Sequence, residues 1–232
     1  MFRKVFSIKK IFKGEVDSSE GTLKIYSNDA SLFEIKPQLV VFPKDSEDVK
    51  ALVRFVNNSK VNDKTISITP RSAGTDMSGG AIGASIIMDF TKYMHGIKEV
   101  NENHAIVEPG CFYRDLEKET LKRKRIMPAF TASKEICAVG GMVANNSGGE
   151  KTIKYGKVEN YIEKLKVVLK DGNEYTIKPL SQSELLKKIE SRPVGGFVGA
   201  HAYTPTILTT ASTIDNANVT FDFAQKPSII VV

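Results

Sequence analysis

Residues 70–85, PRSAGTDMSGGAIGAS, combine small side chains and hydroxyl groups in the manner of a phosphate-binding loop. Ser72, Ala73 and Gly74 are small enough for the backbone to approach a ligand closely. Thr75 adds a hydroxyl donor. Successive backbone N–H groups in such a segment can point into one concavity and bind an anion such as a diphosphate. A glycine-rich turn without a ligand has the same composition, so both interpretations stay open on this segment alone.

The two most common phosphate-binding patterns do not match this segment. Gly74 and Gly79 have the spacing of a P-loop. The lysine and hydroxyl positions of that pattern, however, are occupied by Gly80 and Ala81. The glycine spacing also differs from the dinucleotide fingerprint, and the following residues, SIIMDF at 85–90, predict a strand instead of a helix. A diphosphate would therefore be bound by a loop between two strands.

A second segment, PAFTASKEICAVGGMVANNSGGEKTIKYG at 128–156, contains two glycine pairs. Residues 140–141 and 148–149 are the pairs, and the polar residues 145–147, Asn-Asn-Ser, lie between them. Glycine pairs permit close backbone approach, and asparagine offers an amide to a ring edge or a ribose. Two such loops in one chain favour a nucleotide ligand over two simple turns.

The composition is that of an ordinary globular protein, with 232 residues, 41% hydrophobic content and a net charge of +6. The positive charge favours an anionic ligand, and a dinucleotide satisfies it as well as nucleic acid does. Cys111 and Cys137 lie far apart without metal-ligand spacing, so we expect two reduced thiols in a cytoplasmic protein. No apolar run approaches the roughly 18 residues of a membrane span, and we recognise no signal peptide.

Strands and helices alternate in the first part of the chain. The apolar run at 38–42 ends at Pro43, and a helix is expected next, with Ser46 as its cap and apolar spacing up to Val56. Residues 57–63 break this helix. Further predicted elements are a strand at 66–69, a strand at 85–90, a strand at 104–110 and a helix at 112–124.

The clearest hairpin signal lies at 164–177, where two alternating arms join through Asp171 and Gly172. Alternating strands and helices followed by hairpin pairing predict an α+β fold, with two lobes and a cleft between them.

The two ends of the chain differ from the rest. Residues 1–13 predict a basic helix with phenylalanines among lysines. This helix could lie on an anionic membrane surface or pack its apolar face on the domain's own core, and both interpretations stay open. Residues 193–232 carry few charges and no recognisable motif, so we treat them as a tail of unknown structure.

The two glycine-rich segments occur together with YSNDASLFEIKPQLVVFPKDSEDVKALVRFVN at 26–57 and VVLKDG at 167–172. In this order and spacing the chain resembles the FAD-binding domain of the FAD-linked oxidases, of the vanillyl-alcohol oxidase and p-cresol methylhydroxylase type. It is most similar to the glycolate oxidase and D-lactate dehydrogenase branch. The resemblance covers residues 14–190, and it implies a two-lobed FAD-binding domain at 14–192 with mixed sheets flanked by helices and FAD in the cleft.

The resemblance also implies which residues bind the cofactor. The family's P-R-x-G-G-T loop falls on residues 70–76 and supplies amides to the FAD diphosphate, with Ala73 in place of a common glycine. Its P-x-S segment falls on 131–133, and its V-G-G-M-x-A-N-N-S-G-G segment falls on 139–149. The implied cofactor-binding residues are Pro70, Arg71, Ser72, Ala73, Gly74, Thr75, Asp76, Ser78, Thr131, Ala132, Ser133, Val139, Gly140, Gly141, Asn145, Ser147 and Gly148.

Some members of the family carry a histidine at the position of Thr75 that bonds covalently to the flavin. Threonine cannot form that bond, so the resemblance implies dissociable FAD.

No catalytic residue is assigned. In this family the flavin carries the hydride chemistry, and the substrate-facing residues belong to a cap domain that residues 193–232 do not resemble. His95, His104 and His201 are isolated, so no metal site is expected. Cys137 is expected to be a small buried thiol.

Three functions remain in view. The first is an FAD-dependent oxidoreductase that oxidises a D-2-hydroxy acid resembling lactate, glycolate or 2-hydroxyglutarate, and that passes electrons to an acceptor protein. The second is an FAD-binding fragment or subunit that needs a partner subunit for catalysis. The third is a basic protein of a membrane surface or of nucleic acid, suggested by the N-terminal segment and LKRKR at 121–125. We expect no nucleic acid, because cations at a helix C-terminus favour its dipole and no aromatic platform accompanies them.

Overall fold

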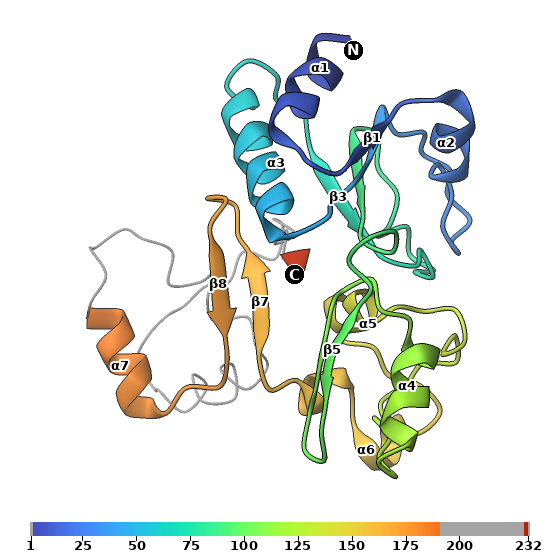
Figure 1. Cartoon of the computed structure of the whole chain (residues 1–232), viewed down its shortest axis with the longest axis vertical. Helices are drawn as coiled ribbons and strands as arrows, with labels where there is room; N and C mark the ends of the chain where they lie inside the picture. The colour runs from blue at the N-terminus through green and yellow to red at the C-terminus, as the bar shows by residue number, and fades with distance from the viewer. Residues whose placement is uncertain (1, 191–229, 232) are drawn as a thin grey trace.

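The computed structural model describes residues 2–190, 230 and 231. A four-stranded sheet has the order β1–β2–β4–β3. The neighbours β2 and β4 run parallel, as do β4 and β3, whereas β1 is antiparallel to β2 (Figure 1). The bounds of these strands are Glu15–Asp17 for β1, Leu39–Phe42 for β2, Ile68–Arg71 for β3 and Ile86–Asp89 for β4.

Both faces of this sheet are covered by helices. Leu39 and Val41 of β2 belong to the core cluster that α1 and α3 share, whereas Val40 and Phe42 pack with Leu23 of α2. Successive strand residues point to opposite faces, so the continuous apolar run of β2 serves two clusters. The helices are α1 (Phe2–Ile11), α2 (Glu20–Ile25) and α3 (Ser46–Ser59).

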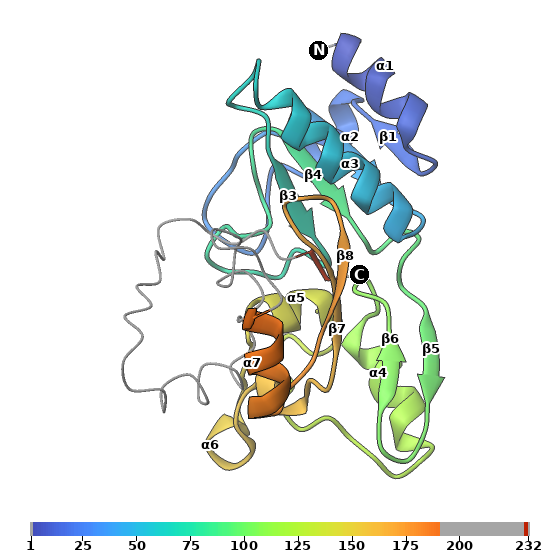
Figure 2. The ribbon, with the colours of Figure 1, turned by 90° about the vertical axis from the view of Figure 1, so that its left-hand side faces the viewer.

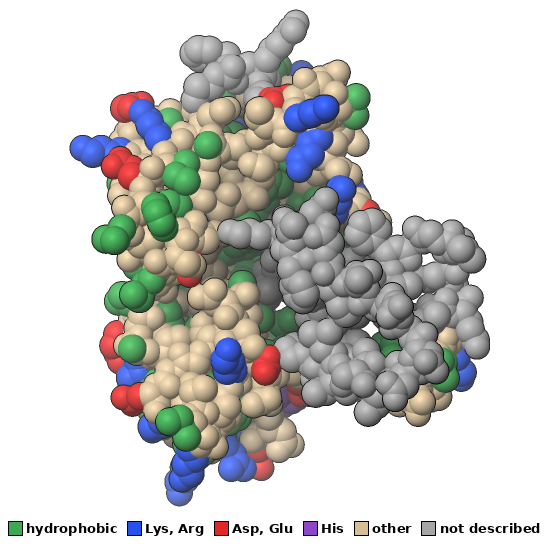
Figure 3. Space-filling view, turned by 180° about the vertical axis from the view of Figure 1, so that it is seen from behind, with side chains coloured by type: hydrophobic (Ala, Val, Ile, Leu, Met, Phe, Trp, Pro, Cys, Tyr) green, Lys and Arg blue, Asp and Glu red, His purple; other side chains and the backbone are tan. Residues whose placement is uncertain are grey.

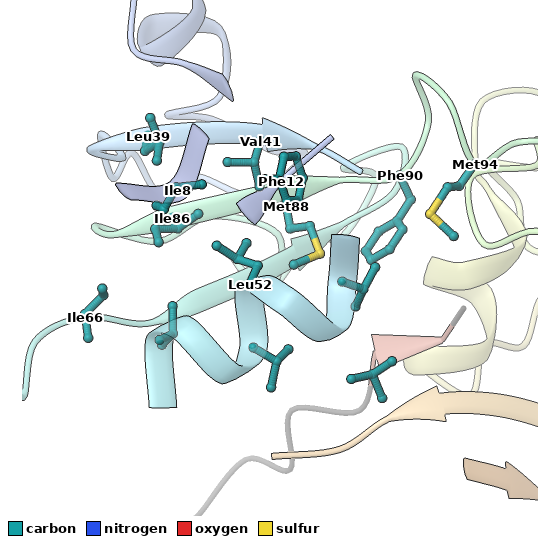
Figure 4. Packing of buried hydrophobic residues seen from close by; sticks show 14 residues of the cluster. Ile8, Phe12, Leu39, Val41, Leu52, Ile66, Ile86, Met88, Phe90 and Met94 are labelled. Atoms are coloured by element: carbon teal, nitrogen blue, oxygen red, sulfur yellow. The ribbon is translucent and has the colours of Figure 1, made fainter. Parts of the chain in front are cut away.

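The residue that caps helix α3 lies one position earlier than the sequence predicts. The cap is Asp45, whose Oδ1 accepts the backbone N–H of Asp48 at 3.0 Å. The prediction of Ser46 as the cap was wrong, because a carboxylate stands at the extended position just before it. The helix continues to Ser59, past the predicted break at residue 57. Figure 4 shows the apolar side of α3 against the strands, with Leu52 facing Met88 and Ile86.

Helix α1 packs against this same core. Ile8 and Phe12 are buried, while Phe6 on another side of the helix is 64% exposed. The buried carboxylate of Asp48 also accepts the N–H of Lys13 at 2.7 Å, which fixes the chain just after α1. The structure therefore shows the N-terminal helix packed on the domain's own core.

A second group of elements surrounds its own apolar cluster. Tyr113, Phe130, Met142 and Val158 form the centre of this cluster. The strand predicted at 104–110 is β6 of a hairpin whose first strand, β5, the sequence did not reveal. The elements here are β5 (Ile97–Val100), β6 (Ala105–Val107), α4 (Tyr113–Leu121), α5 (Val139–Ala144), α6 (Thr152–Tyr155) and a 3-10 helix, η1 (Val158–Tyr161).

The predicted hairpin at 164–177 is confirmed. Strand β7 (Leu165–Val168) pairs antiparallel with β8 (Glu174–Ile177), and Gly172 in the turn has a φ of 74°. The turn lies against α3, where Arg54 Nη2 donates to Asn173 Oδ1 at 3.1 Å. Helix α7 (Gln182–Glu190) follows, and β9 (Ile230–Val231) pairs with the other edge of β7. The rest of the predicted tail lies outside the described residues.

Figures 1 and 2 place α1, α3 and the four-stranded sheet toward one end of the molecule, and α4, α5 and α6 toward the other. Mixed sheets with flanking helices confirm the predicted α+β class. Large apolar side chains that stay exposed include Leu32, Phe33 and Met77. Figure 3 shows apolar side chains along one edge of the face it presents.

Candidate FAD site

The first glycine-rich segment connects two parallel neighbours, β3 and β4, and leaves the carboxyl end of β3 after Arg71. Ligands of parallel sheets commonly bind beside such ends. In the described part of the chain, no protein acceptor pairs with the backbone N–H groups from Ser72 to Met77. Residues 72–76 are half-buried and Met77 is 81% exposed, so these donors are accessible to a ligand. This row of consecutive unpaired donors therefore offers a site for an anionic acceptor.

The segment is curled by two glycines and one carboxylate. Gly74 and Gly79 have φ values of 67° and 82°, a region that side chains disfavour. Asp76 Oδ2 accepts the N–H of Gly80 at 2.5 Å and that of Ser78 at 3.2 Å. Burial acts to raise the pKa of Asp76, but these hydrogen bonds outweigh it and hold that pKa below its ordinary value. Asp76 is thus an ionised clamp that turns the loop back on itself.

The structure joins the two glycine-rich segments directly. Asn145 Nδ2 donates to Asp76 Oδ1 at 3.3 Å, a contact between residues 69 positions apart. The carbonyl oxygen of Pro109 accepts from Ser72 Oγ at 3.1 Å and from the N–H of Gly140 at 2.8 Å. One carbonyl oxygen thus accepts a hydrogen bond from each segment, and the bond between Asn145 and Asp76 adds a second contact. The place where the two segments meet is called the junction below.

The glycine pair of the second segment has two different roles at this junction. A Cβ at Gly140 would lie 2.7 Å from the Pro109 carbonyl oxygen and 2.9 Å from Ser72 Oγ. A Cβ at Gly141 would meet nothing within 4 Å. Only glycine fits at Gly140 without a shift of its neighbours, whereas Gly141 borders open space beside the junction.

Part of the second segment is a helix, although the glycine pairs predicted a loop. Residues 139–144 form α5, and Met142 on it is 2% exposed. Packing of this methionine outweighs the low helix propensity of the two glycines. The helix ends at Ala144 with Asn145 as its C-cap, and Asn146 has a φ of 43°. The N–H of Ser147 returns to the Met142 carbonyl at 2.9 Å, so Ser147 closes the helix end.

The predicted hydroxyl residues at 131–133 lie in the first part of the second glycine-rich segment, which folds back on its later part. Thr131 Oγ1 and Ser133 Oγ are 2.9 Å apart, and Thr131 also lies 3.4 Å from Cys137 Sγ. A Cβ at Gly149 would run into the Phe130 carbonyl, so the backbones approach closely there. Within the described residues, no hydrogen bond connects residues 131–133 with the loop after β3.

The remaining predicted residues fall along the same three segments. Pro70 and Arg71 end β3, where an edge position tolerates a proline. Val139 begins α5. Ala73, Thr75 and Ser78 lie in the loop after β3, Ala132 is exposed between Thr131 and Ser133, and Gly148 is exposed just before Gly149.

Sequence reasoning missed one segment that contacts the loop. Residues 26–30, called the bracket below, lie against it: Arg71 Nη1 donates to the Asn28 carbonyl at 2.8 Å, and the N–H of Ala30 donates to the Gly74 carbonyl at 3.2 Å. Asn28 and Arg71 are 43 positions apart, and no spacing pattern links such residues. These contacts are made by backbone carbonyls, which carry no signal of their own in a sequence.

Histidines and cysteines lie apart from this junction. His95 and His104 are exposed, and His201 lies outside the described residues. Among the residues that the structure describes, no cluster of three His, Cys, Asp or Glu could hold a metal ion. Cys111 and Cys137 are buried and unpaired with each other. Burial raises the pKa of the Cys111 thiol to about 11, with Asp115 and Glu108 adding to the effect.

A small hollow lies beneath α1, lined mainly by apolar side chains such as Ile8, Leu39 and Ile66. It borders Ser85 and Ile86 at the start of β4, away from the carboxyl ends of β3 and β4. We regard the junction of the glycine-rich segments as the candidate site, because the hollow carries almost no polar groups for an anion. No described helix has both the length and the apolar character needed to cross a bilayer.

Comparison with known proteins identifies the family of the chain. Residues 37–178 match the family described as FAD binding domain. The chain is 27% identical over 184 residues to a D-2-hydroxyglutarate dehydrogenase from Haemophilus influenzae, and 30% identical over 162 residues to glycolate oxidase subunit GlcD from Bacillus subtilis. A solved alkyldihydroxyacetonephosphate synthase superposes with a TM-score of 0.66 at 20% identity, which shows a shared fold.

The similarity covers most of this chain but only part of each relative. It covers 78% of the chain and 18% of the dehydrogenase, 68% of the chain and 33% of the GlcD subunit, and 80% of the chain and 37% of the synthase. The chain therefore spans less than two fifths of the length of these relatives. These matches confirm the resemblance to the FAD-linked oxidases.

Proposed function

The chain belongs to the FAD binding domain family, and from this premise we propose that it binds FAD non-covalently between its two glycine-rich segments. We propose further that the bound FAD takes part in the oxidation of a D-2-hydroxy acid. The observation that carries the proposal is the row of unpaired N–H groups from Ser72 to Met77. A diphosphate presents several anionic oxygens in a row, which is the acceptor pattern that such donors suit. The open space at Gly141 leaves room for the nucleotide beside this row.

We assign the residues to different parts of the cofactor. The amides of residues 72–77 hold the diphosphate, with the hydroxyl of Thr75 as a further donor, whereas the Ser78 hydroxyl donates to Asp76 and supports the loop. The segments at 131–133 and 139–149 line the flavin and the adenosine. Thr75 carries no ring nitrogen for a covalent bond, so the cofactor is held by hydrogen bonds, charge and packing alone.

Bound FAD supplies a hydride acceptor for the oxidation of an alcohol carbon. This chain's residues hold the cofactor and fix its place; no described residue is assigned as acid or base. The substrate class is proposed from the relatives, since one is named a D-2-hydroxyglutarate dehydrogenase and another a glycolate oxidase subunit. We therefore expect a 2-hydroxy acid resembling lactate, glycolate or 2-hydroxyglutarate.

A second candidate is an FAD-binding subunit that needs a partner for catalysis. It is favoured by the relative from Bacillus subtilis, which is itself named a subunit of glycolate oxidase. The partner would supply the substrate-facing residues or accept the electrons.

An absorption spectrum of the purified chain after incubation with FAD tests the proposal. We expect bound flavin that remains after gel filtration and that loses its visible absorbance when D-lactate, glycolate or D-2-hydroxyglutarate is added without oxygen. Bound flavin that none of these acids bleaches favours the second candidate. A colourless protein after gel filtration contradicts both.

We also propose a cytoplasmic location. The two buried cysteines, Cys111 and Cys137, are free thiols, and this supports a reducing compartment.

A further inference from the structure

Arg71 is surrounded by groups that hold it behind the loop after β3. Its Nη1 donates to the Asn28 carbonyl at 2.8 Å and approaches the Ala81 carbonyl at 3.4 Å. A Cβ at Gly74 would run into the guanidinium, so the loop backbone passes directly over it. Arg71 therefore fills the inside of the loop, between its first residues and its return at Ala81.

The guanidinium also stacks on an aromatic ring. Its central carbon lies 5.1 Å from the centroid of Tyr26, within the range of a cation–π contact. Tyr26 is held in turn, because its hydroxyl donates to Asp89 Oδ2 at 2.9 Å. Asp89 is 3% exposed and also accepts the N–H and the hydroxyl of Thr91, both at 2.6 Å. A buried carboxylate at the end of β4 thus fixes the ring on which Arg71 rests.

Arg71 has no ion-pair partner among the described residues. Its partners are two carbonyls and a ring, none of which neutralises a full positive charge. Asp89 bonds to Tyr26 and Thr91 instead, and Asp29, which follows Asn28, accepts the N–H of Ala81 at 3.4 Å. A partly buried and unneutralised cation is costly unless an anion lies nearby. The unpaired N–H groups of residues 72–77 lie on the same loop, so the charge and the donors favour the same anion.

We propose that Arg71 is a positioning residue of the FAD site, which shapes the row of N–H donors from inside the loop and adds positive charge behind the diphosphate. The inference rests on the proposed function and deepens it. Tyr26, on the bracket, is the second positioning residue, because its ring keeps the guanidinium in place. Neither side chain needs to touch the cofactor: Nη1 is already used by Asn28 and Ala81.

Charge and shape can be separated by substitution. Arg71→Met removes the charge and keeps a flexible stem. Arg71→Lys keeps the charge but loses the planar guanidinium that stacks on Tyr26. Tyr26→Leu removes the stacking ring and leaves the charge in place. Arg114→Met is the matched control, because Arg114 also stacks on a ring, Phe112 at 4.4 Å, and donates to a carbonyl, but on α4.

The readout is the dissociation constant of FAD at low and high salt for the full chain, with thermal melting of each variant as a check on folding. We expect Arg71→Met to weaken FAD binding about tenfold or more, and to reduce its dependence on salt because a charge has been lost. Arg71→Lys and Tyr26→Leu are expected to weaken binding while keeping the wild-type dependence on salt. Arg114→Met should bind as the wild type does.

Each other outcome has a definite meaning. Wild-type binding by Arg71→Met, or an equal loss in Arg114→Met, overturns the inference and leaves the proposed function intact. Full recovery by Arg71→Lys overturns the positioning role, since charge alone would then suffice. If Arg71→Met does not fold, the test rests on Arg71→Lys and Tyr26→Leu: weaker FAD binding by both supports the inference, and wild-type binding by both overturns it. Absence of FAD binding by the wild-type chain contradicts the proposed function itself, and the inference with it.

Discussion

Asp76 places a negative charge in the loop where we propose that a diphosphate binds, and its contacts explain how the loop accommodates it. Its two oxygens accept from the backbone of Ser78 and Gly80, the hydroxyl of Ser78 and the amide of Asn145. The charge is therefore spread over donors of the protein. Since Asn145 belongs to the second glycine-rich segment, the same carboxylate also helps to hold the two segments together.

Replacing Asp76 with alanine sets two effects against each other. The change removes repulsion of the diphosphate, but it also releases the turn and the contact with Asn145. We expect the second effect to dominate, because surface repulsion is screened by salt, and FAD binding to weaken about tenfold. Isothermal titration measures this directly. Asp63→Ala is the control, since Asp63 accepts the N–H of Thr65 in a similar turn elsewhere, and tighter binding by Asp76→Ala would contradict the account.

Thr75 determines how the cofactor is attached. A threonine hydroxyl forms no stable bond to the flavin ring, so precipitation with acid should release all yellow colour into the supernatant. Absorbance of the pellet and mass spectrometry of the dissolved protein check this. A flavin mass that stays on the polypeptide would show a covalent bond and refute the prediction.

At the scale of elements, local signals and long-range contacts were predicted with different success. The hairpin at β7 and β8 was predicted correctly, because Asp171 and Gly172 determine the turn by themselves. Helix α5 and strand β5 were not predicted. The glycines of α5 suggest a loop, but Met142 is buried in the second apolar cluster, and the N–H groups of Val139 and Gly140 bond to carbonyls far along the chain. The bracket was missed for a similar reason, because its contacts join carbonyls to residues far along the chain.

Alanine substitutions at the two adjacent glycines in the first turn of α5 are expected to have opposite effects on stability. Gly140→Ala should destabilise the protein by about 1–3 kcal/mol, because the new methyl group would crowd Pro109 and Ser72. Gly141→Ala should leave stability unchanged or raise it by up to about 1 kcal/mol, since alanine is the better helix former. The free energy of unfolding in urea distinguishes them.

The same pair tests the location of the cofactor. If FAD lies beside the junction, Gly141→Ala should fold normally but bind FAD more weakly, because its methyl group would occupy the open space. Gly141→Ala with wild-type affinity would place the cofactor elsewhere, and equal stability of the two variants would contradict the packing at Gly140.

At the scale of the whole molecule, the proposed site brings together segments that are anchored by two separate apolar clusters. One cluster fills the space between α1, α3 and the four-stranded sheet, and the other surrounds Tyr113 and Phe130. The loop after β3 leaves the first body, and α5 belongs to the second. A ligand that contacts both segments would add to the hydrogen bonds that already join them, from Asn145 to Asp76 and from Ser72 and Gly140 to the Pro109 carbonyl.

This arrangement predicts that FAD stabilises the chain as a whole. At a concentration of about 100 times its dissociation constant, FAD should add about 2.7 kcal/mol to the free energy of unfolding. Melting curves followed by circular dichroism should shift to higher temperature. Riboflavin, which lacks the diphosphate, should shift the curve less. An equal shift by both ligands would mean that the amides of residues 72–77 contribute nothing.

The most direct measurement of the central claim is an NMR titration of the 15N-labelled chain with FAD, in which each backbone amide reports its own surroundings. The account predicts that the amide signals of Ser72 to Met77 and of Gly141 move together, and by more than the signals of the β7–β8 hairpin turn. Tight binding of FAD that leaves the Ser72 to Met77 signals in place would contradict the claim that this row of N–H groups holds the diphosphate.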